Sequence, residues 1–138
     1  MAVSGGMLRV ETAGDGRIVD LTEGVRSVLR TSAVQRGLAT VFVRGSTAAV
    51  TTMAFEPGGE EDLTALLDEL VPRVRERARD RRSGEADAHA HLRAALLGPS
   101  ESVPVVDGDL LLGSRQQLVL LDFDDRPRRR EIAVQIVS

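Results

Sequence analysis

The sequence predicts an α+β domain with a largely antiparallel or mixed sheet. Short segments with alternating or continuous apolar residues recur along the chain and indicate about seven or eight strands. About three other segments have apolar residues at helical spacing, and these are inserted between pairs of strand-like segments. The 138 residues suffice for one domain with a sizeable core, and we find no internal repeat or linker.

The composition excludes several classes of protein. Three Phe and no Trp or Tyr leave no aromatic platform for stacked bases, and the formal charge of −3 argues against general affinity for nucleic acid. The absence of Cys excludes disulfides and thiolate chemistry and agrees with a reducing compartment. No apolar run approaches the roughly 20 residues of a membrane span, and no signal peptide is recognisable. We expect a cytoplasmic protein that binds neither nucleic acid nor membranes.

The first part of the chain predicts a hairpin. Residues 1–7 are small and polar and are expected to form a loose start that can be disordered. Residues 8–12 alternate between apolar and polar side chains, as a half-buried strand does. The sequence Ala-Gly-Asp-Gly at 13–16 indicates a turn, so residues 17–21 are predicted to return as the partner strand.

A first helix is predicted to follow this hairpin. Thr22 is the expected N-cap, and Gly37 is expected to end the helix. Its apolar face consists of Val25, Val28, Leu29 and Ala33.

Two strands and a second helix are predicted next. Residues 39–43 are rich in β-branched side chains, and residues 48–56 resume as a strand after a polar interruption. Pro57 and the two glycines after it end that strand. The helix starts with the acidic residues 60–62 at its positive end, and Pro72 kinks its last turn or ends it. Its apolar stripe consists of Leu63, Leu66, Leu67 and Leu70.

An arginine-rich segment precedes the third helix. Residues 73–82 contain six arginines and two acids. This composition is typical of a solvated surface segment, and the alternative is an edge that binds anions.

The third helix contains both histidines of the chain. Asp87 is predicted to cap its start, and Gly98 to end it in the left-handed conformation. His89 and His91 are two residues apart, so on a helix they point about 200° from each other and cannot share a ligand. If the segment is still extended at His89, the two side chains would share a face. We expect one histidine inside a site and the other on the surface. The predicted buried face consists of Leu92, Ala95 and Leu96.

The last part of the chain predicts further strands. Asp107 and Gly108 between two apolar runs indicate a hairpin formed by residues 102–106 and 109–113. Residues 118–121 are apolar on both faces, so this strand is expected to be covered on both sides. The final strand is expected to face the core with Ile132, Val134 and Ile136.

Two polar features border these strands. Residues 122–130 form a dense charged bend, which is either a self-neutralising hairpin tip or a subunit contact across a symmetry axis. Gln116 and Gln117 precede an apolar strand, so one of them must point inward. A buried amide needs partners, and Gln117 is therefore either structural or part of a polar site.

Three blocks of the sequence resemble the YjbQ-like family, which is often labelled secondary thiamine-phosphate synthase. They are STAAVTTMAFEPG at 46–58, DAHAHLRAALLGPS at 87–100, and residues 103–130, which run from VPVVDGDLLLG into QQLVLLDFDDRPRRR. The resemblance implies mixed, largely antiparallel sheets in a sandwich-like core with about three helices. It also implies a homotrimer, with a polar pocket lined by histidines near the subunit interfaces. The labelled activity joins a pyrimidine diphosphate to a thiazole phosphate, usually with magnesium.

The sequence departs from the family at residues that would carry this chemistry. Gly45-Ser46-Thr47 stands where the family has His-Thr-Thr or His-Thr-Ser, and Arg77-Ala78-Arg79 stands where it has Tyr-x-His. Asp87 replaces the usual Asn, and Arg115 replaces the usual Trp.

The residues that remain define the predicted site. Of three family histidines only His91 stays in register, and the resemblance implies that it is catalytic together with Glu56 and Gln117. The predicted ligand-binding residues are Ser46, Thr47, Arg79, Asp87, His89 and Arg115. Because the loss of two imidazoles should abolish a three-histidine metal site, we expect no tight Zn²⁺ binding, with His91 the one candidate ligand. Mg²⁺ would be held mainly by the phosphates of a substrate.

The sequence is compatible with three functions. The first is a divergent homotrimer with a weakened or lost histidine site that binds a phosphorylated small molecule, because Arg79 and Arg115 would favour an anion. The second is an active transferase of the thiamine-phosphate-synthase type. The third is a non-catalytic assembly or scaffold protein.

Overall fold

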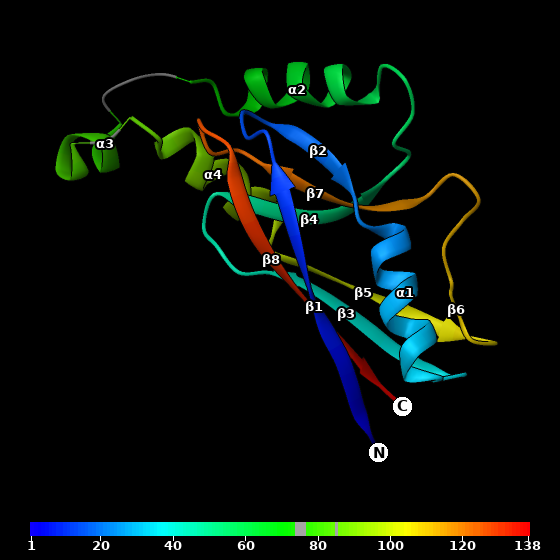
Figure 1. Cartoon of the computed structure of the whole chain (residues 1–138). Helices are drawn as coiled ribbons and strands as arrows, with labels where there is room; N and C mark the ends of the chain where they lie inside the picture. Colours follow the sequence, from blue (N-terminus) through cyan, green and yellow to red (C-terminus); the bar gives the residue numbers. More distant parts are fainter. Residues whose placement is uncertain (74–76, 85) are drawn as a thin grey trace.

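Two antiparallel sheets and four helices make up the part of the chain described by a computed structural model, residues 1–73, 77–84 and 86–138 (Figure 1). The larger sheet has the order β1 (Val3–Thr12), β8 (Arg128–Val137), β3 (Gly37–Val43), β5 (Ser100–Val106) and β6 (Asp109–Leu110). The smaller sheet has the order β2 (Arg17–Asp20), β7 (Gln117–Asp122) and β4 (Ala48–Met53). The helices are α1 (Thr22–Ser32), α2 (Gly59–Leu70), α3 (Ala78–Ser83) and α4 (Ala88–Leu97). The predicted α+β class with mostly antiparallel sheets is confirmed.

Strand β7 lies at the centre of the packing. Leu118 and Leu120 pack with α1 and with the inner face of the larger sheet. Val119 and Leu121 pack on the opposite side, with residues of α2 and α4. The layers are therefore the larger sheet, the smaller sheet and the two helices. The prediction that this strand is covered on both sides is confirmed.

The N-terminal strand is longer than predicted. β1 pairs with β8 along its whole length, so the expectation of a loose start is wrong for residues 3–7. Gly5 permits the close approach of the two strands, because a Cβ atom there would lie 2.0 Å from the carbonyl oxygen of Val134.

Of the two predicted hairpins, one forms and the other does not. β5 and β6 pair through Asp107 and Gly108, whose φ angles of 52° and 75° fit a type I′ turn. β1 and β2 belong to different sheets, so the first hairpin prediction is wrong. The backbone N–H of Gly16 donates to the carbonyl of Asp122 at 2.7 Å, which directs β2 onto β7 and away from β1.

The predicted first helix forms with different ends. Thr22 is its first residue and not its cap, and the Thr22 N–H donates to Oδ1 of Asp20 at 2.9 Å. The hydroxyl of Thr22 is used elsewhere, since it accepts the N–H of Leu118 at 3.0 Å. The helix stops before Ala33, which has a left-handed φ of 57°, and Gly37 begins β3.

Helix α4 is buried through a different face from the predicted one. Leu92 and Leu96 are 45% and 59% exposed, so the prediction that they lie in the core is wrong. The guanidinium of Arg93 takes the interior position instead, where it donates to the carbonyl of Val71 at 2.8 Å and to Asp68 at 2.9 Å. The buried face consists of Ala88, His89, Ala90, Arg93 and Ala94. The small alanines let the helix lie close to β4.

The apolar stripe of α2 is only partly used. Leu67 is buried, whereas Leu66 and Leu70 are exposed, which corrects the predicted stripe. The helix ends at Leu70, before Pro72, in agreement with one of the two predictions for that proline. None of the helices in the described ranges is long and apolar enough to cross a membrane.

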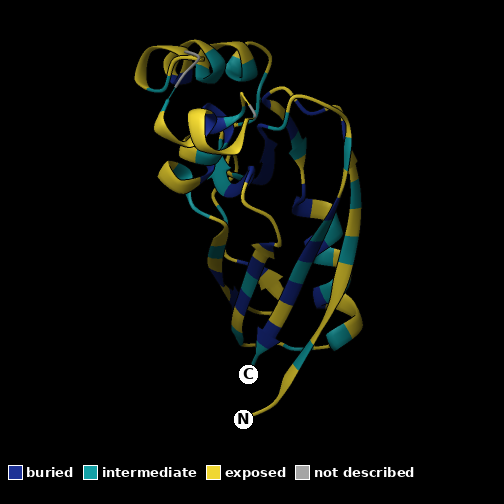
Figure 2. Ribbon diagram, turned by 90° about the vertical axis from the view of Figure 1, so that its left-hand side faces the viewer, coloured by how far each residue is buried: buried dark blue, intermediate teal, exposed yellow. Residues whose placement is uncertain are grey.

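The outer face of the larger sheet is left open to solvent (Figure 2). Residues directly opposite each other in a ladder present their side chains on the same face. By this register, one face carries five exposed large apolar side chains: Val3, Met7, Leu38, Phe42 and Val106. Their exposed fractions range from 42% to 61%.

Candidate functional site

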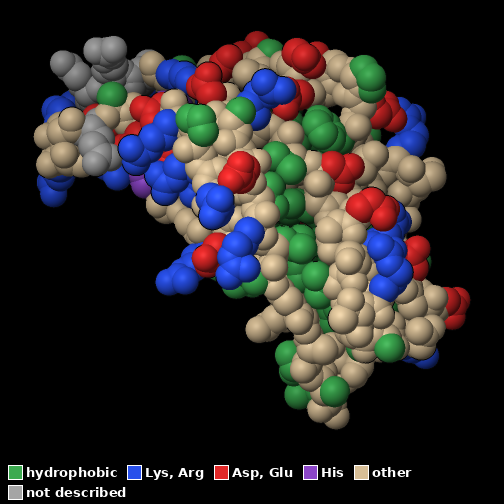
Figure 3. Space-filling view, viewed as in Figure 1, with side chains coloured by type: hydrophobic (Ala, Val, Ile, Leu, Met, Phe, Trp, Pro, Cys, Tyr) green, Lys and Arg blue, Asp and Glu red, His purple; other side chains and the backbone are tan. Residues whose placement is uncertain are grey.

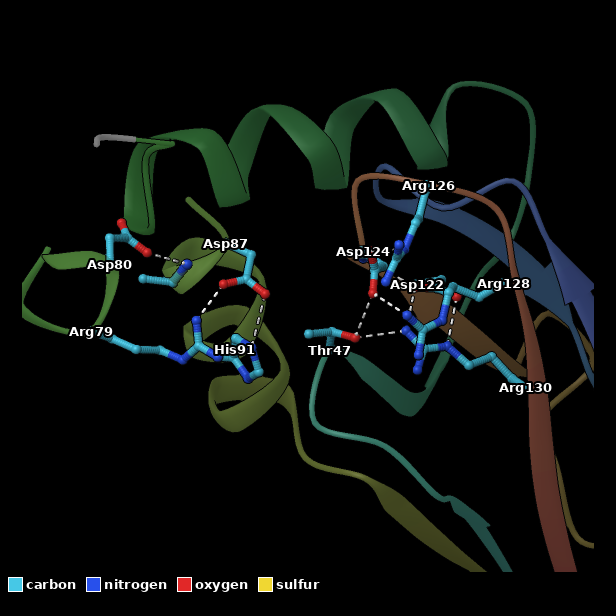
Figure 4. A network of polar contacts seen from close by, with 11 residues as sticks. Thr47, Arg79, Asp80, Asp87, His91, Asp122, Asp124, Arg126, Arg128 and Arg130 are labelled. Atoms are coloured by element: carbon cyan, nitrogen blue, oxygen red, sulfur yellow. Dashed lines mark hydrogen bonds and ion pairs between the residues drawn. The ribbon is translucent and has the colours of Figure 1, made fainter. Parts of the chain in front are cut away.

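A cleft of about 630 Å³ opens between the helices and the ends of the sheets. Its helical side is formed by α3 and α4, and its opposite side by the loop between β3 and β4 and the turn between β7 and β8 (Figure 4). Basic and acidic side chains gather in this part of the surface (Figure 3). The polar residues that line the cleft are Arg44, Ser46, Thr47, Arg79, Asp87, His91, Asp124, Asp125, Arg126, Arg128 and Arg130.

The helical side holds an ordered chain of three groups (Figure 4). Nε2 of His91 lies 3.2 Å from Oδ2 of Asp87, and Arg79 donates to the other oxygen of the same carboxylate. Burial raises the pKa of Asp87, but the charge of Arg79 and the hydrogen bond with His91 outweigh this and lower it. An ionised Asp87 orients the imidazole, an arrangement suited to proton transfer.

The helix cap predicted for Asp87 is supplied by another residue. Oδ1 of Asp80 in α3 accepts the N–H of Ala88 at 2.9 Å and so fixes α3 to the start of α4. Asp87 makes no side-chain capping bond, and its carboxylate is free to face the cleft. Gly98 does end the helix, but with a ψ of 158° and not in the left-handed helical conformation.

The sheet side is built on a buried ion pair. Arg130 donates through Nε and Nη2 to the two carboxylate oxygens of Asp122, both at 2.7 Å. The hydroxyl of Thr12 donates to Asp122 at 2.6 Å, and Nη2 of Arg130 donates to the hydroxyl of Thr47 at 2.8 Å. Burial raises the pKa of Asp122, but the hydrogen bonds from Arg130 and Thr12 outweigh it and keep the pKa below its usual value.

Arg130 lines the cleft, although the sequence predicts it as part of the charged bend and not as a site residue. It is only 4% exposed. A signal was present in the sequence, because Arg130 is in phase with the inward residues Ile132, Val134 and Ile136 of β8. Its charge and its two arginine neighbours obscured that periodicity.

Ion pairs largely neutralise the outer part of the charged bend at residues 122–130, in agreement with the interpretation as a self-neutralising hairpin tip. Asp124 lies 3.2 Å from Arg128 and 3.8 Å from Arg126. Arg129 pairs with Glu11 of the adjacent strand at 2.9 Å. The interpretation as a subunit contact stays a prediction.

His89 does not line the cleft. Its side chain lies in the interior, and its Nε2 is buried without a hydrogen-bond partner in the described structure. Burial and the charges of Arg73 and Arg93 lower the pKa of His89, which favours the neutral ring. Of the two histidines, only His91 lines the cleft, and the prediction that the other lies on the surface is wrong because His89 is buried.

Glu56, Arg115 and Gln117 lie together in another region. Arg115 donates through Nε and Nη2 to the two carboxylate oxygens of Glu56, both at 2.6 Å. Oε1 of Gln117 accepts the N–H of Phe55 at 2.9 Å, which is the structural role left open by the sequence. The structure thus brings together Ser46, Thr47, Arg79, Asp87 and His91 of the predicted site residues, but not these three or His89.

The arginine-rich segment is partly outside the described residues, because it includes residues 74–76. Within the described part, Arg73 pairs with Asp15 at 2.5 Å, and Arg79 faces the cleft. The choice between a solvated segment and an anion-binding edge therefore rests on Arg79.

The donor set does not fit a three-histidine metal centre. Among the described residues, no group of three or more His, Asp or Glu side chains is placed to hold a metal ion. His91 and Asp87 supply two donors at most from the described part of the cleft, fewer than the three or four protein ligands that zinc sites have.

Comparison with known proteins agrees with the resemblance noted in the sequence. A sequence model for the UPF0047 protein YjbQ-like family matches residues 6–138. A UPF0047 protein of Mycobacterium bovis is 42% identical over 132 residues, which cover 96% of this chain and 99% of that protein. A hypothetical protein of Aeropyrum pernix K1 has a structure with a TM-score of 0.88 and 30% identity, over 100% of this chain and 99% of that one. A YbjQ-like protein of unknown function from Sulfolobus solfataricus has a TM-score of 0.87 and 28% identity, over 98% of both chains. The chain therefore belongs to the YjbQ-like UPF0047 family.

Proposed function

We propose that this protein is a divergent YjbQ-like homotrimer whose cleft binds a phosphorylated small molecule and whose histidine site is weakened or lost. The observation that carries the proposal is the charge of the cleft, whose lining contains five arginines and three aspartates. Asp122 does not line the cleft but pairs with Arg130. When Asp122 is counted as well, the arginines still outnumber the aspartates. Guanidinium groups match the geometry of phosphate oxygens, so an anion of this kind fits the lining.

The homotrimer follows from the family resemblance and has support in the exposed sheet face. Five large apolar side chains on one face of a sheet form a patch of the kind that marks an interaction surface. A second copy of the chain is the partner proposed for it. Phe42→Glu is expected to lower the mass in solution, whereas Leu111→Glu, at an exposed residue outside that face, is the matched control. A mass unchanged by Phe42→Glu would exclude this face as the interface.

Binding of a phosphorylated molecule is tested by calorimetry with inorganic phosphate and a panel of phosphate monoesters. Arg79→Ala is expected to weaken binding about tenfold, because it removes one cation and also releases Asp87 into the cleft. Heats that stay flat across the panel would remove the binding proposal. Flat heats with an intact oligomer would favour an assembly or scaffold protein, located in the cytoplasm as the composition suggests.

A second candidate is an active transferase of the thiamine-phosphate-synthase type. It is favoured by the contact between His91 and Asp87, because a carboxylate-oriented imidazole in a cleft can accept and return a proton. Magnesium would enter with the phosphates of the substrate. Rescue of a thiamine auxotroph that is lost with His91→Ala would support this candidate, and failure to rescue at high expression would count against it.

A further inference from the structure

We infer that Nη1 of Arg130 is the anchor for the phosphate group in the cleft, and that Gly45 is the residue that leaves this anchor uncovered. This inference rests on the proposed binding of a phosphorylated molecule and assigns its central contact. The ligand class is a phosphate monoester in its doubly charged form.

The three nitrogens of the Arg130 guanidinium are used unequally. Nε and Nη2 are occupied by Asp122 and Thr47. Nη1 makes no hydrogen bond to any described residue, although Arg130 as a whole is 4% exposed and lines the cleft. Because Nη1 has no partner among the described residues and Arg130 lines the cleft together with Gly45, its two N–H groups are available to a molecule in the cleft.

Gly45 lies directly beside Nη1 of Arg130. A Cβ atom at Gly45 would lie 2.8 Å from Nη1 of Arg130, closer than side-chain atoms normally come. The φ angle of Gly45 is 154°, so the backbone there also favours glycine. Any other residue at this position would push against Nη1 and cover it. Glycine keeps the approach from the cleft open.

Hydrogen bonds hold the guanidinium of Arg130 in a fixed orientation. Asp122 holds the guanidinium in a two-pronged pair, and Thr47 fixes the Nη2 end (Figure 4). Thr12 in turn donates its hydroxyl to Asp122. The direction of the Nη1 donors is therefore set before a ligand arrives, and binding orders no flexible side chain at this point. A buried guanidinium attracts an anion more strongly than an exposed one does, because solvent and salt screen the exposed charge.

The surroundings favour a dianion over a carboxylate. Arg126 and Arg128 lie on the same side of the cleft and share one partner, Asp124, at 3.8 and 3.2 Å. The side chains of Arg126 and Arg128 are 71% and 37% exposed, so both have room to turn toward a ligand held at Arg130. A phosphate monoester presents three oxygens, enough for Nη1 and for these two cations, and its second pKa of about 6 makes it doubly charged above neutral pH.

The experiment compares two glycine variants. Gly45→Ala covers Nη1 without changing any charge, and Gly58→Ala is the control, because Gly58 also has a positive φ, of 88°, but has no atom within 4 Å of its would-be Cβ. The probe is phenyl phosphate in calorimetry at about pH 8, where it is a dianion. Gly45→Ala is expected to weaken binding about tenfold or more, with Gly58→Ala equal to the wild type.

The outcomes separate this inference from the proposed function. Binding by the wild type with equal affinity in Gly45→Ala would overturn the anchor and leave the proposed function standing. No binding by the wild type would overturn both. Should Gly45→Ala fail to fold, the side-chain ¹⁵N signals of wild-type Arg130 replace it as readout. A saturable shift of the Nη1 signals on titration with phenyl phosphate supports the anchor, and unshifted signals in a protein that binds would refute it.

Discussion

Arg130 and Asp122 join the two sheets at their ends through a two-pronged ion pair, with both N···O distances at 2.7 Å. Arg130 comes from β8 of the larger sheet and Asp122 from β7 of the smaller one. The pair is 4% and 0% exposed, and the hydroxyls of Thr12 and Thr47 add hydrogen bonds to Asp122 and to Nη2 of Arg130. It closes the floor of the cleft and at the same time fixes the distance between the sheets.

Asp122→Asn is expected to destabilise the protein by about 3–5 kcal/mol, because it leaves the charge of Arg130 buried without a counter-ion. Urea unfolding measures the change. The matched control is Glu11→Gln, which breaks the exposed pair with Arg129 and is expected to cost less than about 1 kcal/mol. Equal losses in the two variants would contradict a special role for the buried pair.

Acidification should destabilise the protein through His89. Burial and the charges of Arg73 and Arg93 lower the pKa of His89 in the folded chain, against the opposing charges of Asp80 and Asp87. In the unfolded chain the pKa returns to about 6.5. Between the two values the unfolded chain binds a proton that the folded chain does not, so the free energy of unfolding falls as the pH drops below about 6.5.

The measurement is urea unfolding at about pH 7.5 and about pH 5.5, which lie on either side of the unfolded-state pKa. His89→Gln removes the titrating group and is expected to reduce the loss of stability between the two values. An unchanged loss in this variant would assign the pH dependence to other groups.

Arg128 and Arg115 should differ in their effect on ligand affinity. Arg128 lines the cleft, whereas Arg115 is held by Glu56 in another part of the chain. Calorimetry with phenyl phosphate is expected to show binding weakened about tenfold in Arg128→Ala and unchanged in Arg115→Ala. An equal loss in Arg115→Ala would mean that this arginine reaches the ligand, for example from a second copy of the chain.

Zinc should not copurify in a stoichiometric amount. His91 and Asp87 provide two donors on the helical side of the cleft, and a zinc site in a protein has three or four. Elemental analysis of protein prepared without a metal-affinity tag checks this, together with the melting temperature before and after a chelator. One zinc per chain would show that donors beyond the described residues complete a site.

The elements that the sequence predicted well are those with local determinants. The apolar run of β7 and the Asp107–Gly108 turn need no distant partner to be recognised, and both predictions were confirmed. The first hairpin was wrong because its turn is held by a carbonyl of Asp122, far along the chain. Pairing at long range is decided by contacts that no local pattern contains.

The candidate site was only partly predictable for the same reason. Ser46, Thr47 and His91, which the family motifs single out, line one cleft in the structure. The predicted buried face of α4 was wrong. Leu92 fits the apolar spacing of a helix, whereas Arg93 is buried because its guanidinium donates to the carbonyl of Val71, 22 positions earlier in the chain. A charged side chain enters a core when the core supplies its partners, and hydrophobic spacing cannot foresee this.

Thr22 offers a last test of how the helix α1 is attached to the central strand. Its hydroxyl accepts the N–H of Leu118, which is the first of the four fully apolar residues of β7. Thr22→Val keeps the shape of the side chain but leaves that buried N–H without its acceptor, a loss of about 1–3 kcal/mol in urea unfolding. Thr31→Val is the control, because the hydroxyl of Thr31 is exposed and bonds only within its own helix, to the carbonyl of Ser27. A loss in Thr22→Val no larger than in Thr31→Val would mean that water or a shifted backbone satisfies Leu118, and that α1 is held by its apolar face alone.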